Sequence, residues 1–183
     1  MKSSSISRMH KTLILQDGFT IIELMIVVAL AGILVAFALP NYQLMVRNNC
    51  MTATATGLVT SLQLARSEAI KRRANVSVVA GQPGVGPGPS TNEWGAGWYV
   101  WFDTNGDGNY DANEELRVTM PICTATIDET TADRTVSVYG SDGFILNSSS
   151  FAVCIDNTGE TGRQIDISAT GRPNTDELIC TSP

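Results

Sequence analysis

The residues best suited to chemistry in this sequence lie in one polar segment, DTNGDGNYDANE, at residues 103–114. Six of them carry side-chain oxygens at positions 1, 3, 5, 7, 9 and 12 of the segment, and Gly108 falls at position 6, where a calcium-binding loop turns sharply. Because Ca²⁺ takes about six to eight oxygen ligands, this spacing predicts a calcium site of the EF-hand loop pattern. The candidate ligands are Asp103, Asn105, Asp107, Asn109, Asp111 and Glu114.

The flanks of this 103–114 loop do not fit an EF-hand. Residues 98–102 before it and residues 116–120 after it read as strands, whereas an EF-hand loop lies between two helices. Asp, Asn and Gly are also favoured in the turn of a β-hairpin for backbone reasons alone. Two interpretations therefore stay open: a calcium site, and a polar hairpin turn without a cofactor.

Four cysteines, Cys50, Cys123, Cys154 and Cys180, form a second candidate group. In an oxidising compartment an even number of cysteines indicates two disulfides, with three alternative connectivities. We favour Cys154 with Cys180, which would hold down the C-terminal tail, and Cys50 with Cys123, which would tie a helix to a sheet. The alternative is that one pair stays reduced.

Catalysis finds little support in the sequence. The only histidine is His10, and there is no C-x-x-C pair, so zinc ligation, thioredoxin-like chemistry and Ser-His or Cys-His catalysis are poorly supported. The Gly-rich stretch at 81–89 lacks the Lys and Ser/Thr of a phosphate-binding loop. We therefore predict that the protein is not an enzyme and has no catalytic residues.

The N-terminal element contains a carboxylate, Glu23, within an apolar segment. It is the only charge in the apolar run FTIIELMIVVALAGILVAFAL at residues 19–39, which as a helix spans about 30 Å, the thickness of the hydrocarbon core of a bilayer. A carboxylate in lipid costs about 2.5 kcal/mol or more. Glu23 therefore needs a partner or a function.

Charge is distributed unevenly about Gly18. The first eighteen residues hold three basic residues and one acidic residue, and the rest of the chain holds 9 basic and 17 acidic residues, a net charge of −8. A basic start before an apolar run predicts a cytoplasmic N-terminus and places the acidic remainder across the membrane. The acidic charge also disfavours nucleic acid as a partner.

The segment GFTIIEL at residues 18–24 resembles the class III leader motif of type IV pilins. The resemblance implies that prepilin peptidase cuts between Gly18 and Phe19, that Phe19 becomes N-methylated, and that Glu23 guides docking into a filament. As the fifth residue of the cut chain, Glu23 could pair with the α-amine of a neighbouring subunit. Gly32 and Pro40 fall where pilins carry residues that weaken the helix.

Two ordinary membrane-targeting readings compete with this one. A secretory signal would have a basic start and an apolar run, and Ala36-Phe37-Ala38 supplies an A-x-A cleavage site. However, the run is longer than the usual signal core of about 7–15 residues, and Glu23 would lie inside it. A simple signal anchor explains the span but neither Gly18-Phe19 nor Glu23.

The remaining elements are predicted from periodicity. Beyond Pro40 apolar or small residues recur in steps of three and four, which indicates one long helix from about Thr20 to Ala74. Short strand-like runs follow, so we expect an α+β fold in which the helix packs against an antiparallel sheet. The periodic residues are Met51, Ala55, Leu58, Leu62, Ala65 and Ala69, and the expected strands are 76–79, 98–102, 116–120, 135–139, 144–146, 151–155 and 164–168.

These patterns divide the chain into four parts. We expect a leader at residues 1–18 that is removed, a transmembrane and filament-core helix at 19–39, an amphipathic continuation of that helix at 40–74, and a periplasmic β-rich domain at 75–183. The expected location is the bacterial inner membrane, crossed once, with the C-terminal domain in the periplasm.

Three further segments, residues 58–78, 97–118 and 151–173, resemble the GspH/FimT (FimU) branch of the pilin family. This branch contains pseudopilins of type II secretion systems and minor pilins of type IV pili. The resemblance implies a structural subunit that acts in filament assembly or initiation near the tip. Its implied partners are other pilin or pseudopilin subunits, prepilin peptidase and membrane lipid. The sequence does not distinguish a secretion system from a pilus.

Two alternative functions belong to other classes. Some FimT-type pilins bind DNA through a GRxR motif. The corresponding segment here, Gly171-Arg172-Pro173-Asn174, lacks the second arginine, and acidic residues such as Asp156 and Asp176 lie near it in the sequence. A turn with a solvated arginine is the simpler reading. The other alternative is a membrane-anchored, calcium-binding periplasmic domain that never assembles.

Overall fold

A computed structural model describes residues 18–84, 93–155 and 158–181. The chain separates into two compact units, Met1–Tyr42 and Gln43–Pro183, and each is described by itself. The predicted leader lies outside the described residues except for Gly18, and so does the part of the Gly-rich stretch from residue 85 onward.

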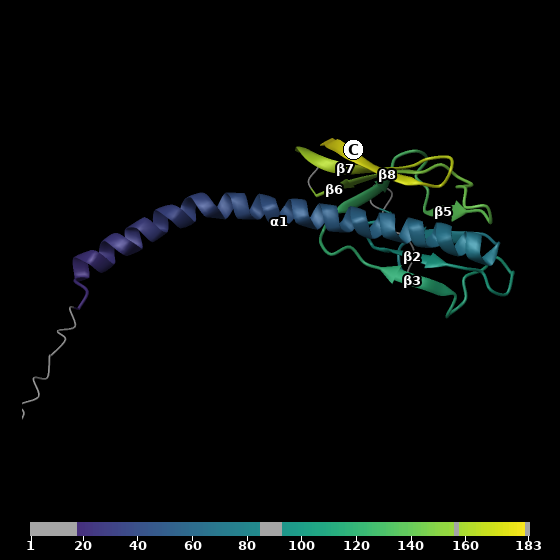
Figure 1. Ribbon diagram of the computed structural model, residues 1–183, viewed down its shortest axis with the longest axis horizontal. Helices are drawn as coiled ribbons and strands as arrows, with labels where there is room; N and C mark the ends of the chain where they lie inside the picture. Colours follow the sequence, from purple (N-terminus) through teal and green to yellow (C-terminus); the bar gives the residue numbers. More distant parts are fainter. Residues whose placement is uncertain (1–17, 85–92, 156–157, 182–183) are drawn as a thin grey trace, which may run out of the picture. The chain divides into compact units, whose positions relative to one another are not determined.

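The first unit contains the start of helix α1, Ile21–Arg72 (Figure 1). Thr20 caps this helix, because its Oγ1 accepts a hydrogen bond from the backbone N–H of Glu23 at 3.2 Å. Every side chain from residue 18 to residue 39 is exposed. By length and composition α1 is able to cross a membrane, and none of its most apolar stretch is buried.

The second unit contains the remainder of α1, whose apolar stripe is buried as the periodicity predicts. All six predicted stripe residues, from Met51 to Ala69, are at most 5% exposed. On the outer face Glu68 accepts hydrogen bonds from Arg72 at 2.7 Å and Lys71 at 3.2 Å. The helix ends where Arg73 adopts a left-handed conformation, with φ at 55°.

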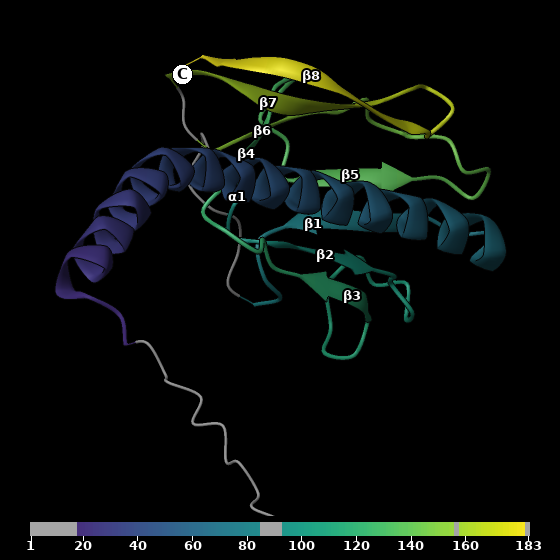
Figure 2. The ribbon, with the colours of Figure 1, turned by 60° about the vertical axis from the view of Figure 1, so that its left-hand side comes forward.

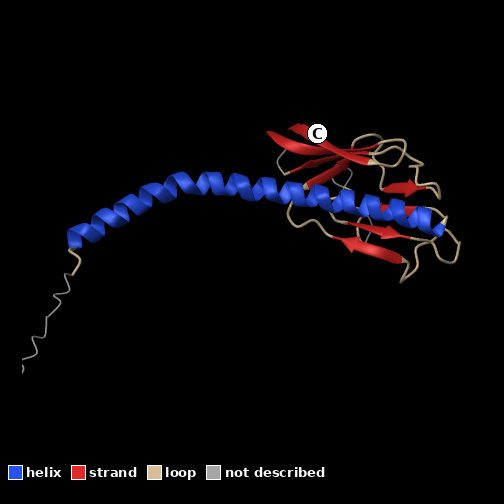
Figure 3. Ribbon diagram, viewed as in Figure 1, coloured by secondary structure: helices blue, strands red, loops and turns tan. Residues whose placement is uncertain are grey.

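Two antiparallel four-stranded sheets pack with this part of the helix (Figures 2 and 3). One has the order β3-β2-β1-β5 and the other the order β4-β6-β7-β8. The expectation of an antiparallel sheet against a helix is confirmed, although the strands divide into two sheets. The strands are β1 (Val76–Ala80), β2 (Trp98–Trp101), β3 (Glu115–Thr119), β4 (Thr126–Glu129), β5 (Val136–Tyr139), β6 (Ser150–Cys154), β7 (Thr158–Ile167) and β8 (Pro173–Thr181).

Three segments differ from the sequence-based prediction. β4 and β8 were not expected, because β4 has a single strongly apolar residue, Ile127, and β8 is an edge strand that is exposed along most of its length. The strand expected at 144–146 is wrong. Gly143, at a φ of 78°, closes a turn there by donating its N–H to the Gly140 carbonyl, and only Ile145 forms an isolated bridge, to Tyr139.

Buried tryptophans connect the elements of the second unit. The Trp98 indole N–H on β2 donates to Ser61 Oγ on α1 at 2.9 Å, in a fully buried contact. Trp94 packs edge-on against Phe151 of β6, with ring centroids 4.9 Å apart. One tryptophan therefore joins the helix to the first sheet, and the other joins the segment before β2 to the second sheet.

Two disulfides link distant parts of the second unit. Cys50 on α1 is joined to Cys123 in the connection between β3 and β4, with Cα atoms 6.1 Å apart. Cys154 on β6 is joined to Cys180 on β8, with Cα atoms 6.0 Å apart. This second bridge passes over β7 at Gly162, where an added Cβ would collide with Cys180 Sγ. These are the two pairs favoured from the sequence.

Candidate functional site

The predicted processing and assembly residues lie at the exposed start of the first unit. Gly18 and Phe19 are both exposed, Phe19 at 85%, and no atom approaches a Cβ built on Gly18. Phe19, Glu23, Leu24 and Val27 line one shallow apolar hollow at the start of the helix.

Glu23 also has a local role in starting the helix. It stands three residues after the cap Thr20, in the spacing of a capping box, and its negative charge lies in the first turn, where the helix dipole favours an anion. In a chain cut after Gly18, a free α-amine at Phe19 would begin four residues earlier. The site thus combines a carboxylate, an apolar surface and a potential new cation.

The 103–114 loop connects β2 and β3, so its flanks are strands, as expected, and not the helices of an EF-hand. Its acidic side chains are held by backbone donors of the loop itself. The Asp103 carboxylate accepts from the N–H groups of Gly106 at 2.6 Å and Gly108 at 2.8 Å. Glu114, only 7% exposed, accepts from the N–H groups of Thr104 at 2.7 Å and Asp111 at 3.1 Å.

The other proposed ligands of this loop are also hydrogen-bonded to one another. The Asn105 amide donates to Asp107 at 3.2 Å and to Asp111 at 2.8 Å, and the Asn109 N–H donates to Asp107 at 2.7 Å. Within the loop, all of which the structure describes, no three carboxylates offer oxygens within 4.8 Å of one another. The loop is thus ordered as a turn, and calcium would have to draw its acidic groups closer.

Tyr110 anchors the loop on the sheet. Its ring packs edge-on against Tyr99 and Trp101, with centroids 5.3 Å and 6.0 Å away, and its hydroxyl donates to Glu115 at 2.8 Å. Burial, together with the hydrogen bond to Glu115, raises the pKa of Tyr110 to about 12. The hydroxyl therefore stays protonated and keeps donating at neutral pH.

The Gly171-Arg172 segment is a tight turn. Gly171, at a φ of 75°, donates its N–H to the Ser168 carbonyl at 2.8 Å, and the Ser168 N–H donates to the Arg172 carbonyl at 3.0 Å. A Cβ on Gly171 would collide with the Gly143 carbonyl, so backbone packing accounts for this glycine. Arg172 is exposed and shares a shallow hollow with Arg66, and Asp156 lies outside the described residues.

One acidic group was not predicted from the sequence. Glu93, Asp128 and Asp133 come from separate segments, and one oxygen of each lies within 4.8 Å of the others. Their spacing along the chain matches no ligand motif, because turns and strand pairing bring them together. No pattern in the sequence singles out these three residues.

The apolar N-terminal helix followed by antiparallel sheets, with disulfides in the second unit, defines the class of pilin-like proteins. Residues 15–39 match the prokaryotic N-terminal methylation motif, and residues 54–171 match the family of the type II transport protein GspH. The second match spans well over half of the chain. The chain therefore belongs to the GspH family, whose members are minor pilins or pseudopilins, structural proteins and not enzymes.

Individual relatives agree with this placement. The chain is 31% identical over 102 residues to the pilin-like protein PilA1 of Thermus thermophilus, covering 56% of this chain and 58% of that protein. It is 72% identical over 29 residues to the type IV major fimbrial protein FimA of Dichelobacter nodosus, covering 16% of this chain and 19% of FimA. The chain thus spans less than two thirds of each of these relatives.

A solved structure shows the same fold. The type IV minor pilin FimU of Pseudomonas aeruginosa superposes with a TM-score of 0.54 at 24% identity, covering 68% of this chain and 91% of FimU. A second crystal form of FimU gives a TM-score of 0.56. The predicted fold and family are confirmed. Proteins of this family generally have no cofactor.

Proposed function

We propose that this chain is a membrane-anchored subunit that loses its leader at Gly18 and assembles into a type II secretion pseudopilus or a type IV pilus, where it acts in initiation near the tip. The observation that carries the proposal is the exposure of every side chain from residue 18 to residue 39. Each large apolar side chain in that stretch forgoes about 1.5–3 kcal/mol of burial in water. Lipid, and then the helices of other subunits, would cover this surface.

Glu23 supplies specificity to that assembly. Apolar helices can slide past one another with little change in energy, whereas a carboxylate in an apolar surrounding needs one defined partner. The α-amine of a neighbouring subunit, at its Phe19, is a partner of opposite charge that only cleavage creates. Assembly would therefore require cleavage, and the Glu23–amine pair would fix the axial position of one subunit relative to the next.

The orientation in the membrane follows from charge and from the cysteines. The basic residues before Gly18 favour the cytoplasmic side, so the second unit would reach the periplasm. The two disulfides of that unit, Cys50–Cys123 and Cys154–Cys180, suit an oxidising compartment. The proposed location is accordingly the bacterial inner membrane, crossed once.

Processing provides the direct test. The full chain is produced with and without prepilin peptidase, and its mass and N-terminal sequence are determined. We expect an N-methylated Phe19 only when the peptidase is present. A Gly18→Val variant should stay uncut, whereas Gly32→Ala, placed where a Cβ meets no atom, should be cut as in the wild type. Cleavage at Ala38 in place of Gly18 would overturn the proposal in favour of a secretory signal.

The 103–114 loop could bind calcium within this role. The buried Glu114 and the ligand spacing from Asp103 support that proposal, while the hydrogen bonds among the loop's own groups support a plain turn. An Asp107→Asn variant removes one ligand charge from an exposed position. Loss of a calcium-binding event in this variant would assign that event to the loop.

A further inference from the structure

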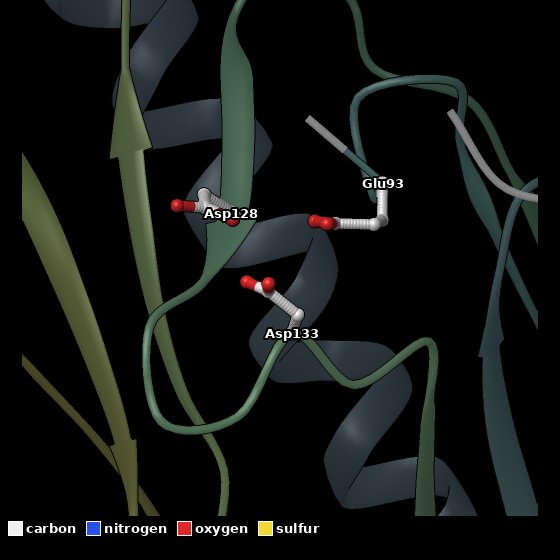
Figure 4. A group of neighbouring side chains, drawn as sticks. All are labelled: Glu93, Asp128 and Asp133. Atoms are coloured by element: carbon white, nitrogen blue, oxygen red, sulfur yellow. The ribbon is translucent and has the colours of Figure 1, made fainter. Parts of the chain in front are cut away.

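Three carboxylates converge beside β4, the edge strand of the second sheet (Figure 4). Glu93 lies in the segment that leads into β2, Asp128 lies on the edge strand β4, and Asp133 lies in the turn between β4 and β5. One oxygen of each lies within 4.8 Å of the other two. Three like charges at this separation repel one another strongly unless something neutralises them.

The carboxylate of Glu93 is buried and faces the carboxylate of Asp128, which hydrogen-bonds to it only when one of the two is protonated. Glu93 is 3% exposed, and no N–H or other hydroxyl group in the part of the chain that the structure describes donates to either oxygen. The Oδ1 atom of Asp128 is also buried and unpaired. A buried polar group without a partner costs about 1–3 kcal/mol, and more when it is charged. Burial raises the pKa of Glu93 and of Asp128, and the charge of each neighbour adds to the rise for Glu93.

The protein holds Glu93 in place through its neighbour. The Trp94 N–H donates to the Ile127 carbonyl on β4 at 3.2 Å, and the Trp94 indole N–H donates to the Arg134 carbonyl at 2.9 Å. The indole also packs against Phe151. These contacts fix the backbone next to Glu93 against both β4 and the turn, independently of the carboxylate itself.

The turn that contains Asp133 is held in place by hydrogen bonds to Glu129. The fully buried Glu129 carboxylate accepts hydrogen bonds from four backbone N–H groups, three of them in the turn that contains Asp133. Asp133 itself adopts a left-handed conformation, with φ at 48°, which for a residue with a Cβ carries a cost. The turn is therefore built to a defined shape that turns Asp133 toward Glu93 and Asp128.

From this arrangement we propose that Glu93, Asp128 and Asp133 bind one calcium ion. Carboxylate oxygens are the ligands of hard cations, and oxygens on opposite sides of Ca²⁺, each about 2.3–2.6 Å from it, are about 4.6–5.2 Å apart. Calcium accepts irregular geometry, whereas Mg²⁺ demands a near-ideal octahedron, and three carboxylates on three segments do not supply one. Asp133 is exposed, so that side of the ion is open to water ligands.

The ion would link the two sheets. It would join the segment that leads into β2, in the first sheet, to β4, in the second sheet. The consequence is a calcium-dependent stability of the second unit, separate from Glu23 and from filament assembly. The competing state is a pair of carboxyls sharing a proton, with no metal.

Calorimetric titration of the full chain in detergent micelles with CaCl₂ tests the proposal, and thermal unfolding with and without CaCl₂ supports it. The isosteric variant Glu93→Gln should weaken binding by more than about tenfold and abolish the calcium-dependent rise in Tm. Asp133→Asn, at an exposed position, should weaken binding without a risk to folding. The matched control is Asp107→Asn in the 103–114 loop, which should leave this binding event and its Tm shift intact.

The results divide cleanly. A wild-type protein that binds no Ca²⁺ overturns the proposal and favours the shared proton. So does a Glu93→Gln protein that is folded by circular dichroism and binds with the stoichiometry and affinity of the wild type. If the wild type binds two ions, Glu93→Gln and Asp107→Asn must each remove a different one. Titration with MgCl₂ should show binding at least tenfold weaker, and stronger binding of Mg²⁺ would overturn the choice of calcium.

Discussion

Helix α1 carries two apolar surfaces with opposite environments. From residue 19 to residue 39 apolar side chains face every direction and all are exposed. From Met51 to Ala69 they form one stripe, and every member of the stripe is buried by the sheets of the second unit. The two halves differ in how apolar residues are distributed around the helix. A helix that is apolar on all sides needs lipid or other chains to cover it, whereas an amphipathic helix buries its apolar stripe against its own domain.

The first half of the helix is expected to contribute to the free energy of assembly, and the stripe to the free energy of folding. Changes in the first half should act on assembly and leave the folding of the second unit alone. Changes in the stripe should act on folding. Variants of matched chemistry in the two halves can therefore break this comparison, and the following predictions run from the largest expected effect to the smallest.

Glu23→Ala should have the largest effect. In an assembled filament it would leave a neighbour's α-amine unpaired in apolar surroundings, which costs about 3–5 kcal/mol, equivalent to a hundredfold or greater loss. The amount of this subunit in purified filaments measures the effect. Unfolding of the second unit should be unchanged.

Glu23→Gln is the matched control, because it keeps the size and polarity of the side chain and removes only the charge. We expect incorporation between that of the wild type and that of Glu23→Ala. Normal incorporation of the alanine variant, with cleavage intact, would refute the pairing of Glu23 with an amine.

Leu58→Ala should destabilise the second unit by about 2–5 kcal/mol, because Leu58 is 0% exposed and the substitution leaves a cavity. Leu44→Ala on the same helix is the control, since Leu44 is 52% exposed, and its effect should stay within about 0.5 kcal/mol. Urea unfolding followed by the fluorescence of the buried tryptophans measures both. Equal effects would show that the stripe is not what holds the helix to the sheets.

Removing the Cys154–Cys180 bridge by a double change to serine should lower stability by about 2–4 kcal/mol, through the greater freedom of the unfolded chain. Peptide mapping without reductant should find Cys50–Cys123 intact in that variant. A Cys50–Cys154 peptide in the wild type would contradict the pairing. Gly162→Ala should mimic part of the loss, because a Cβ there collides with the bridge.

Patterns of strong periodicity allowed much of the fold to be predicted. The stripe on α1, the strands around Trp98 and Phe151, and the motif at Gly18 each carry their signal locally, in spacing or in residue type. The 103–114 loop was placed correctly between strands for the same reason.

The parts that were missed depend on contacts between distant segments. β4 and β8 have little apolar alternation, and they become strands because β6 and β7 offer them hydrogen-bonding edges. Glu93 and Asp128 are separated by thirty-five positions, and tertiary contacts, among them the hydrogen bonds of Trp94, bring them together. A buried carboxylate such as Glu129 also looks like a surface residue in a sequence.

Glu129 offers the smallest but most specific test. Burial alone would raise its pKa, but the four backbone N–H donors outweigh burial and lower the pKa below its usual range. Its contribution to stability is therefore present above the unfolded pKa of about 4.3 and is lost as the pH falls through the lower folded pKa. Glu93 and Asp128, with raised pKa values, act in the opposite sense, contributing stability at low pH that is lost as the pH rises.

A Glu129→Gln variant should lose about 1–3 kcal/mol at neutral pH, because an amide cannot accept all four hydrogen bonds and leaves backbone N–H groups unpaired. Its stability should also fall less than that of the wild type between pH 5 and about pH 3. Urea unfolding at a series of pH values measures both effects, with Glu177→Gln at an exposed position as control. If Glu129→Gln kept the acid sensitivity of the wild type, the turn that presents Asp133 would not depend on this carboxylate.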